Sequence, residues 1–381
     1  MNEDKSGAPR KSRVAARLPA GRSQVAAACK KIARFIHQHG LGVGDTLPPQ
    51  TQLRRILGFS NNTLDPAMRL LADMGLLVRR TCRGTEILSL EPLNRLTWTV
   101  GLAVMDLPIR GPGAFYAWLQ HAMQRELSKR QCTSHTYFRV ENYKWPHHRL
   151  EDFPGFAADV EDRAIDGMII FSSLDAQGQS AFAAAGIPLL HCSSQSEMPL
   201  ATLVDSGSMV TGAVRTLLGQ GARRLALVAS SINEREFADI VRREAGAQGG
   251  SGRVTEVFRG VPGAAVGEGV ARTLLQRPEA SRPDALIIDD DYTAMGAARV
   301  LAAQDGYRPR FAVQGNKQLP QAWPMPVLLF ELDIDEVAAC AVRMLQEAML
   351  DPGLPPRQER VPVRLVCGEE KGDRSCERKV G

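Results

Sequence analysis

The sequence lacks long apolar runs and paired cysteine motifs. No apolar run approaches the roughly 18 residues that a membrane span needs, and MNEDKSGAPRKSR at the start leads into no apolar signal-peptide segment. The seven cysteines are an odd number, widely scattered, and no two form a C-x-x-C pair. This argues against a disulfide framework or a zinc knuckle and for reduced thiols. We therefore expect a cytoplasmic protein that does not enter a membrane.

The short motifs of common catalytic and nucleotide sites are also missing. The sequence contains no G-x-G-x-x-G, no P-loop, no G-x-S-x-G elbow and no H-E-x-x-H. The pair His147-His148, even with His135 nearby, lacks metal-ligand spacing, so a solvated loop is favoured over a metal site. We expect no enzymatic activity, no cofactor and no bound metal.

Charge is distributed unevenly along the 381 residues. Residues 1–90 hold fifteen Lys and Arg against six Asp and Glu, a balance of +9; the remaining 291 residues hold 32 against 36, a balance of −4. A positive field restricted to one part of the chain is what a polyanion-binding module needs, although basic segments are also often just soluble tails. The net charge of +5 thus hides a basic head on a mildly acidic body.

The chain is longer than the about 250 to 300 residues that one hydrophobic core supports, so two domains are expected. Apolar residues at three- and four-residue steps predict a helix over 24–39, a second over 51–58 and a third beginning after Ser60. The segments LLVRR, TCRG and TEILSL then indicate a strand, a turn and a strand. Three helices and a hairpin make a winged helix-turn-helix.

A series of residues at fixed spacing runs from position 44 to position 87. Its members are Gly44, Asp45, Leu47, Pro48, Leu53, Leu57, Gly58, Ser60, Thr63, Ala67, Leu70, Gly75, Leu76, Leu77, Arg79, Arg80, Gly84 and Thr85. This series resembles the winged-helix head of the GntR family of bacterial transcription regulators, and it is far more specific than a lone short motif. The resemblance implies double-stranded operator DNA as a partner.

After a connector, short apolar runs alternate with helix-length amphipathic stretches. The runs are WTVGLAVM, DGMIIFSS, GIPLLHC, RRLALVAS, RVTEVF, DALIID, RFAVQG and PVLLFEL. Alternation of this kind predicts βα units, and therefore an α/β fold with parallel sheets and helices on both faces.

Several segments of this body resemble the effector-binding domain of the LacI/GalR regulators, which has the two-lobed fold of periplasmic sugar-binding proteins. They are DGMIIF (166–171), GIPLL (186–190), DDYTAMGA (290–297) and PVLLFELDIDEVAACAV (326–342). A GntR head on such a body is typified by arabinose-responsive repressors. The expected organisation is a disordered basic arm (1–22), a winged helix-turn-helix (23–90), a linker (91–97), an effector-binding and dimerisation domain (98–366) and a disordered tail (367–381).

The start of the third helix, SNNTLDPAMR, departs from the GntR pattern, which places Arg where this sequence has Asn61 and Asp65. Pro66 is the sixth helical residue; it removes a bond to the Asn62 carbonyl and would cost on the order of 3 kcal/mol in a regular helix. Two interpretations stay open. Either the helix is kinked or restarts at Pro66 with Asp65 as its cap, or the head has lost its operator. The arginines retained elsewhere favour the first.

Affinity for DNA comes from cations at phosphates, and sequence information comes from side chains at base edges in the major groove. Asparagine can form a bidentate pair with adenine, and the first turn of a recognition helix normally meets the bases. A glycine permits the tight turn of the wing. The predicted DNA-binding residues are Arg54, Arg55, Asn61, Asn62, Thr63, Arg69, Arg79, Arg80, Arg83 and Gly84.

A two-lobed body binds its ligand where the carboxyl ends of strands from both lobes meet. The resemblance places Asp291 at an acidic position that often bonds ligand hydroxyls; alternatively, the Asp289–Asp291 run only caps the following helix. Lys317 would suit a charged sugar derivative, and Asp205 lies at a family position near the ligand, unless it only orders a loop. The predicted ligand-binding residues are Asp106, Tyr116, Asp205, Arg235, Asp291, Lys317 and Trp323.

An aromatic stretch follows the first strand of the body. Phe115, Trp118, Leu119 and Met123 share helical spacing and are expected in the core, whereas Tyr116 is the candidate for stacking on a ligand.

These inferences combine into one expected function, a homodimeric, ligand-controlled transcription regulator with repression as the default sign. Three alternatives for its ligand stay open: a small sugar, a charged sugar derivative, or no ligand at all. The alternative is a sensor or interaction protein whose DNA-binding head has decayed. The missing catalytic motifs argue against an enzyme, and the missing export signal argues against a transporter-associated sugar-binding protein.

Overall fold

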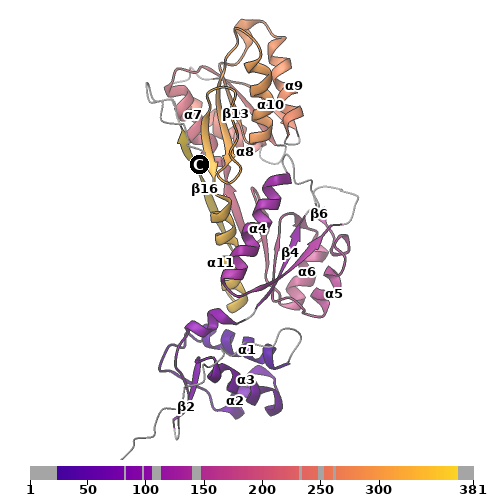
Figure 1. The fold of residues 1–381 in the computed structure, drawn as a ribbon, viewed down its shortest axis with the longest axis vertical. Coiled ribbons are helices and arrows are strands. Elements are labelled where there is room, and N and C mark those ends of the chain that lie inside the picture. The colour runs from indigo at the N-terminus through magenta and orange to yellow at the C-terminus, as the bar shows by residue number, and fades with distance from the viewer. Residues whose placement is uncertain are drawn as a thin grey trace, which may run out of the picture.

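The structure, a computed structural model, describes residues 24–80, 83–96, 98–104, 113–139, 147–230, 234–247, 253–260 and 263–367. Three parts are stacked along the long axis of the molecule: a head at one end, a first lobe in the middle and a second lobe at the far end (Figure 1). The fold is mixed α/β with a large, mostly parallel sheet, as the sequence predicts. Among the described residues, no helix is long and apolar enough to cross a membrane.

The head is the predicted winged helix-turn-helix. Gly58 ends the second helix in the left-handed conformation (φ 74°) and donates its N–H to the Arg54 carbonyl, so the third helix starts at Asn61. The three strands pair antiparallel in the order β1-β3-β2. The elements are α1 (Gln24–Gln38), β1 (Thr46–Leu47), α2 (Gln50–Leu57), α3 (Asn61–Asp73), β2 (Leu77–Arg80) and β3 (Gly84–Ile87). The sequence missed β1, which is too short to give a periodic signal.

A short 3-10 helix, Glu91–Arg95, leads from the head into the first lobe. This lobe has a five-stranded parallel sheet in the order β5-β4-β7-β9-β10. Its strands are β4 (Thr99–Val104), β5 (Thr133–Phe138), β7 (Gly167–Ile170), β9 (Leu189–Ser193) and β10 (Leu200–Asp205). Its helices are α4 (Gly113–Lys129), α5 (Phe156–Glu161), α6 (Ala176–Ala185) and α11 (Ile334–Leu350), and beside it β6 (His147–His148) pairs with β8 (Ser173–Leu174).

The second lobe repeats this design with the order β12-β11-β13-β14-β15, again parallel. Its strands are β11 (Arg224–Ser230), β12 (Arg253–Gly260), β13 (Ala285–Ile288), β14 (Arg310–Asn316) and β15 (Leu328–Leu332). Its helices are α7 (Ser206–Gly219), α8 (Glu234–Ala247), α9 (Ala264–Leu275) and α10 (Asp291–Ala302). Each apolar run predicted as a strand is one, and the helices cover both faces of the sheet.

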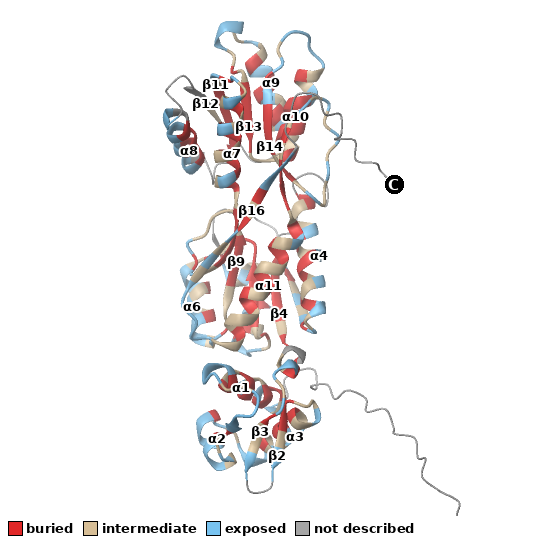
Figure 2. Ribbon diagram, turned by 90° about the vertical axis from the view of Figure 1, so that its left-hand side faces the viewer, coloured by how far each residue is buried: buried red, intermediate tan, exposed pale blue. Residues whose placement is uncertain are grey.

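One strand joins the two lobes. β16 (Arg357–Cys367) pairs parallel with β10 through its first half and antiparallel with β15 through its second half, so a single sheet runs through both lobes (Figure 2). Because β16 is parallel to one strand and antiparallel to the other, β10 and β15 run toward each other. The carboxyl ends of the strands in both lobes therefore face the junction between the lobes.

Helix α10 is set tightly against α9. A Cβ added at Gly267 would overlap the backbone at Thr293, and one added at Gly296 would overlap the backbone at Ala264. Two glycines thus let the helix backbones touch, and this contact fixes α10 over the second-lobe core. The start of α10, and Asp291 with it, is held in a defined position at the junction.

The cysteines whose side chains the structure describes are free thiols: Cys29, Cys132, Cys192 and Cys340. Burial raises the pKa of the Cys132 thiol to about 11. Within the described ranges, no three His, Cys, Asp or Glu residues come close enough together to hold a metal ion.

Candidate functional site

The first turn of α3 is open to solvent. Ser60 caps the helix with an extended backbone (φ −73°, ψ 162°), and its carbonyl accepts the Leu64 N–H at 2.9 Å. Asn61 and Asn62 are exposed and Thr63 is half-buried. No described residue hydrogen-bonds either asparagine amide, so both amides are available to base edges.

Pro66 lies inside an unbroken α3. The helix continues from Asn61 to Asp73, so the predicted restart at Pro66 with Asp65 as a cap is wrong, whereas a kink within the continuous helix stays a prediction. Pro66 lies on the exposed face. The Asn62 carbonyl loses its helical donor there, and water can replace it.

Asp65 joins α2, α3 and the wing. Gln50 Nε2 donates to Asp65 Oδ1, and Arg79 Nη2 lies 3.6 Å from the same oxygen. Arg79 also donates to Gln50 Oε1 at 3.4 Å. The Asp65 carboxylate therefore offsets the charge of Arg79, whose contact with DNA stays a prediction. Sequence reasoning missed Gln50, because its partners are distant along the chain.

Other arginines of the head are exposed, and their side chains make no hydrogen bond or ion pair with a described residue; they are Arg54, Arg55, Arg69 and Arg83. Arg80 is held across the hairpin by Glu86, whose carboxylate lies 3.0 Å from Arg80 Nε. Gly84 has φ 86°, the left-handed conformation that the wing turn needs. Cations thus lie on α2, on α3 and around the wing, and their contacts with DNA stay predictions.

The head is fastened to the first lobe through α1. Lys30 Nζ lies 2.5 Å from Asp166 Oδ2, and both side chains are only 16% exposed. The same carboxylate oxygen accepts the Thr99 N–H at 2.9 Å. The Lys30 ammonium also lies 5.4 Å from the ring centroid of the buried Trp98.

A second contact reaches α11. The Arg34 guanidinium lies 5.3 Å from the centroid of the Trp98 ring, and Arg34 Nε donates to the Met349 carbonyl at 2.7 Å. Met349 is in the last turn of α11, whose lower end faces α1 in Figure 1. The head is thus tied to a helix whose other end reaches the junction between the lobes.

Asp291 lies at this junction, at the carboxyl end of β13. Its side chain is 2% exposed, and burial together with the charge of Asp290 raises the pKa of its carboxyl to about 7. Asn316 Nδ2 donates to Asp291 Oδ2 at 3.4 Å, and Gln321 donates a further hydrogen bond. Near neutral pH such a carboxyl can donate or accept, which suits a ligand hydroxyl.

The helix cap is the preceding residue, Asp290. Its Oδ1 accepts the Thr293 N–H and the Thr293 hydroxyl, both at 2.7 Å. Capping therefore accounts for Asp290 and leaves the Asp291 carboxyl for another role. Binding of a ligand by Asp291 stays a prediction.

Lys317 already has a partner. Its Nζ lies 2.6 Å from Asp333 Oδ2, and Gln318 Nε2 donates to Asp333 Oδ1 at 2.7 Å. Asp333 caps α11 by accepting the N–H groups of Asp335 and Glu336. Lys317 thus fastens the second lobe to the start of α11, and this pair competes with its predicted role toward a charged ligand.

The aromatic stretch on α4 is only partly in the core. Leu119 and Met123 are buried, but Trp118 is 37% exposed, so its predicted core position is wrong. The Tyr116 ring lies 6.3 Å from that of Phe171 and packs against the first-lobe core. Tyr116 is therefore less free to stack on a ligand than the sequence suggested.

The remaining predicted ligand residues are scattered. Asp205 caps α7 by accepting the Ser208 N–H at 3.3 Å, which accords with the loop-ordering alternative. Trp323 is half-buried against the core beneath α9 and α10. Arg235 is exposed on α8, and Asp106 lies outside the described residues.

Two further features were not found from the sequence. His191, the middle residue of β9, is 3% exposed, and burial lowers the pKa of its imidazole to about 4. Its Nδ1 lies 2.6 Å from Ser196 Oγ, while its buried Nε2 has no partner in the described chain. Gln195 Nε2 donates to Glu236 Oε2 at 2.9 Å and so links the lobes. The position of His191 at the end of GIPLLHC was the available signal.

Comparison with protein-family models matches each part of the chain. Residues 22–87 match the bacterial regulatory proteins of the gntR family, and residues 214–369 match the periplasmic binding protein-like domain. Comparison with curated proteins gave no match.

Solved structures share the fold of the body. The lac repressor dimer bound to operator and the anti-inducer ONPF aligns with a TM-score of 0.58 at 17% identity, covering 73% of this chain and 95% of that one. The Cra regulator of Pseudomonas putida in complex with fructose 1-phosphate gives 0.54 at 17%, covering 71% and 99%. A LacI family regulator from Lactobacillus casei with bound sucrose gives 0.55 at 21%, covering 71% and 98%. The chain thus carries a winged helix-turn-helix of the gntR family of bacterial regulatory proteins, followed by a two-lobed, periplasmic binding protein-like body with the fold of LacI-type regulators.

Proposed function

We propose that this chain is a cytoplasmic, homodimeric transcription regulator, a repressor that a small sugar-like effector releases from operator DNA. The observation that carries the proposal is the first turn of α3. Its two asparagines are exposed and unpaired with described residues, and exposed arginines of the same head lie on α2, on α3 and around the wing. Asn61 and Asn62 would read base edges, while Arg54, Arg55 and Arg69 would neutralise phosphates.

The junction between the lobes is the proposed effector site. Asp291, Asn316 and Gln321 join a carboxyl and two side-chain amides there, the groups that bond sugar hydroxyls. Relatives in complex with fructose 1-phosphate and with sucrose support a sugar-like effector. The protein binds this effector without altering it chemically.

The effector would control DNA binding by changing the relative position of the lobes. An effector that bridges them favours one arrangement only by its differential affinity for the two states. The contacts of Asp333 with Lys317 and of Arg34 with Met349 put α11 between the junction and the head. In a dimer, movement of α11 would change the separation of two heads that bind inverted half-sites.

The test is selection of bound sequences from a random duplex pool, at 50 and 200 mM salt. We expect an enriched inverted repeat that the purified dimer binds and that a sugar or sugar phosphate releases. Asn62→Ala should relax the preference at one base position while keeping non-specific affinity. Asp291→Asn should lose the release while keeping the repeat.

The second candidate is a sensor whose head has lost its DNA, and the neutralisation of Arg79 by Asp65 favours it. In that case a folded dimer would enrich no sequence at either salt concentration. Such a result would reject the regulator.

A further inference from the structure

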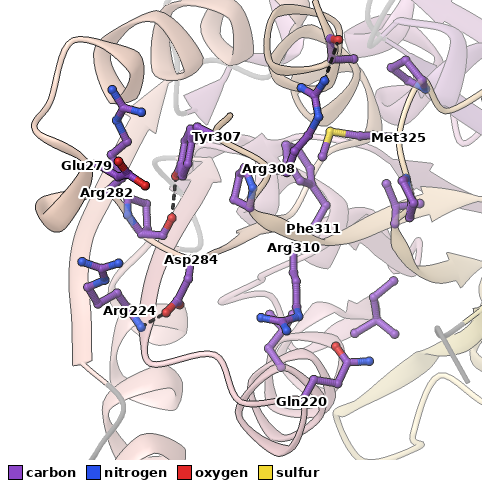
Figure 3. Close-up of a pocket in the computed structure, with 18 residues that line it drawn as sticks. Gln220, Arg224, Glu279, Arg282, Asp284, Tyr307, Arg308, Arg310, Phe311 and Met325 are labelled. Carbon is purple, nitrogen blue, oxygen red and sulfur yellow. Dashed lines mark hydrogen bonds between the residues drawn. The ribbon is translucent and has the colours of Figure 1, made fainter. Parts of the chain in front are cut away.

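A cavity of about 640 Å³ opens in the second lobe, at the end of its sheet away from the junction. Arg224, Arg310 and Leu328, the first residues of β11, β14 and β15, line it, as does Gln220 after the last turn of α7 (Figure 3). Because the strands run toward the junction, these amino-terminal ends lie opposite Asp291. The cavity is thus separate from the proposed effector site, and its volume is ordinary for a small-molecule site.

Positive charge predominates around the cavity. Four lining arginines stand against two lining carboxylates, Glu279 and Asp284. Asp284 is already engaged, because its Oδ1 accepts the backbone N–H groups of Arg223 at 3.0 Å and Arg224 at 2.8 Å. The lining arginines are Arg224, Arg282, Arg308 and Arg310.

Neutral carbonyls, and not carboxylates, hold three of these arginines. Arg282 donates from Nε to the Arg277 carbonyl at 2.9 Å and from Nη2 to the Leu275 carbonyl at 2.8 Å. Arg224 donates to the Ala280 carbonyl, and Arg308 donates to carbonyls in the last turn of α10. Such bonds fix the guanidinium groups without neutralising them, which leaves a preorganised anion-binding rim.

Arg310 is the arginine without such an anchor. It is exposed, and its side chain makes no hydrogen bond or ion pair with any described residue. In Figure 3 it extends toward Gln220, away from Arg308. Its five donors are therefore available to a ligand.

The rest of the lining is apolar. Phe311 is 1% exposed, and Met325 and Val327 before β15 and Leu328 at its start also line the cavity. Tyr307 is fixed by a 2.6 Å hydrogen bond from its hydroxyl to the Pro283 carbonyl. An apolar group of a ligand would pack here while its charged end meets the arginines.

We propose that this cavity binds a small organic dianion with an apolar body, such as a phosphate monoester or a dicarboxylate. A guanidinium matches phosphate and carboxylate oxygens in bidentate geometry, and the balance of four cations to two anions favours a double negative charge. The ligand is a second one, independent of the effector at the junction.

The test is calorimetric titration of the full chain at 50 mM salt with phenyl phosphate, phenylsuccinate, inorganic phosphate and phenol. We expect saturable binding of at least one of the two organic dianions, weaker binding of inorganic phosphate and none of phenol. The organic dianion that binds more tightly identifies the charged group of the ligand as a phosphate or as carboxylates. No saturable binding of either organic dianion would overturn the proposal.

Variants locate the site. Arg310→Gln should weaken binding of that dianion roughly ten-fold or more. Arg310→Lys should have an affinity between those of Arg310→Gln and the unaltered chain, because it keeps the charge but loses the planar, bidentate guanidinium. The matched control is Arg299→Gln, which removes one exposed charge from α10 outside the cavity and should bind like the unaltered chain. Equal losses in the Arg299 and Arg310 variants, or binding lost in Asp291→Asn and kept in Arg310→Gln, would contradict the proposed site.

Discussion

Replacing Asp65 by alanine should strengthen binding to DNA of any sequence. Asp65 offsets the charge of Arg79 at 3.6 Å, and it places a carboxylate beside the predicted recognition turn. Asp65→Ala removes that carboxylate and frees Arg79 for a phosphate. The ion pair is 56% and 41% exposed, so its loss should cost the fold little.

The magnitude follows from counterion release. Each phosphate contact adds about −0.9 to the slope of log affinity against log salt concentration for duplex DNA. If 1 M salt is taken as the concentration at which the contact adds no affinity, one added contact strengthens binding about 15-fold at 50 mM and about four-fold at 200 mM. The gain should therefore shrink as salt increases.

The assay is fluorescence anisotropy with a labelled random-sequence duplex at several salt concentrations between these values. Asp73→Ala is the matched control, because it removes the same charge from the exposed far end of α3, about 12 Å along the helix. An unchanged slope in Asp65→Ala, or an equal gain in Asp73→Ala, would refute the assignment of Asp65 as the partner that masks Arg79.

Three further changes test the structure. Pro66→Ala restores a donor to the Asn62 carbonyl within an unbroken helix and should stabilise the head by up to about 3 kcal/mol, measured by denaturant unfolding. The folded-state pKa of Asp291, about 7, lies above its ordinary 3.8, so the folded chain keeps a proton that the unfolded chain loses. Stability should therefore fall as pH rises from about 4 to 7, and Asp291→Asn should remove that slope. Lys30→Met leaves the Asp166 carboxylate half-buried without its cation and should speed hydrogen exchange in α1, whereas unchanged exchange would mean that this pair does not hold the head.

Much of the fold was accessible from the sequence, because burial on both faces of a parallel sheet requires continuous apolar runs. DALIID and RFAVQG are such runs, and both are central strands. β16 was missed for the converse reason: RQERVPVRLVC mixes charged and apolar residues, because the strand crosses between lobes and is exposed over part of its length. Its identity as a strand depends on partners more than 150 residues away in β10.

The candidate site was less accessible, because its chemistry depends on tertiary neighbours. The family pattern pointed to Asp291, but the sequence could not assign Asn316 as its donor or separate its role from the cap at Asp290. Asp65 was noticed as an anomaly, yet its partner Gln50 lies 15 positions away on another helix. The local sequence fixes helix ends and strand cores, whereas these pairings depend on how helices pack.

Helix α11 converts a small tilt at one end into a larger displacement at the other. Its 17 residues extend about 25 Å, with one end held at Asp333 by side chains of the second lobe and the other end gripped at Met349 by Arg34 of the head. A tilt of about 10° at the capped end would swing the far end by about 4 Å, more than a tenth of the roughly 34 Å repeat between half-sites. Because α11 packs in the first-lobe core, the first lobe would turn with it, and the length of this helix would set how far the head travels for a given tilt.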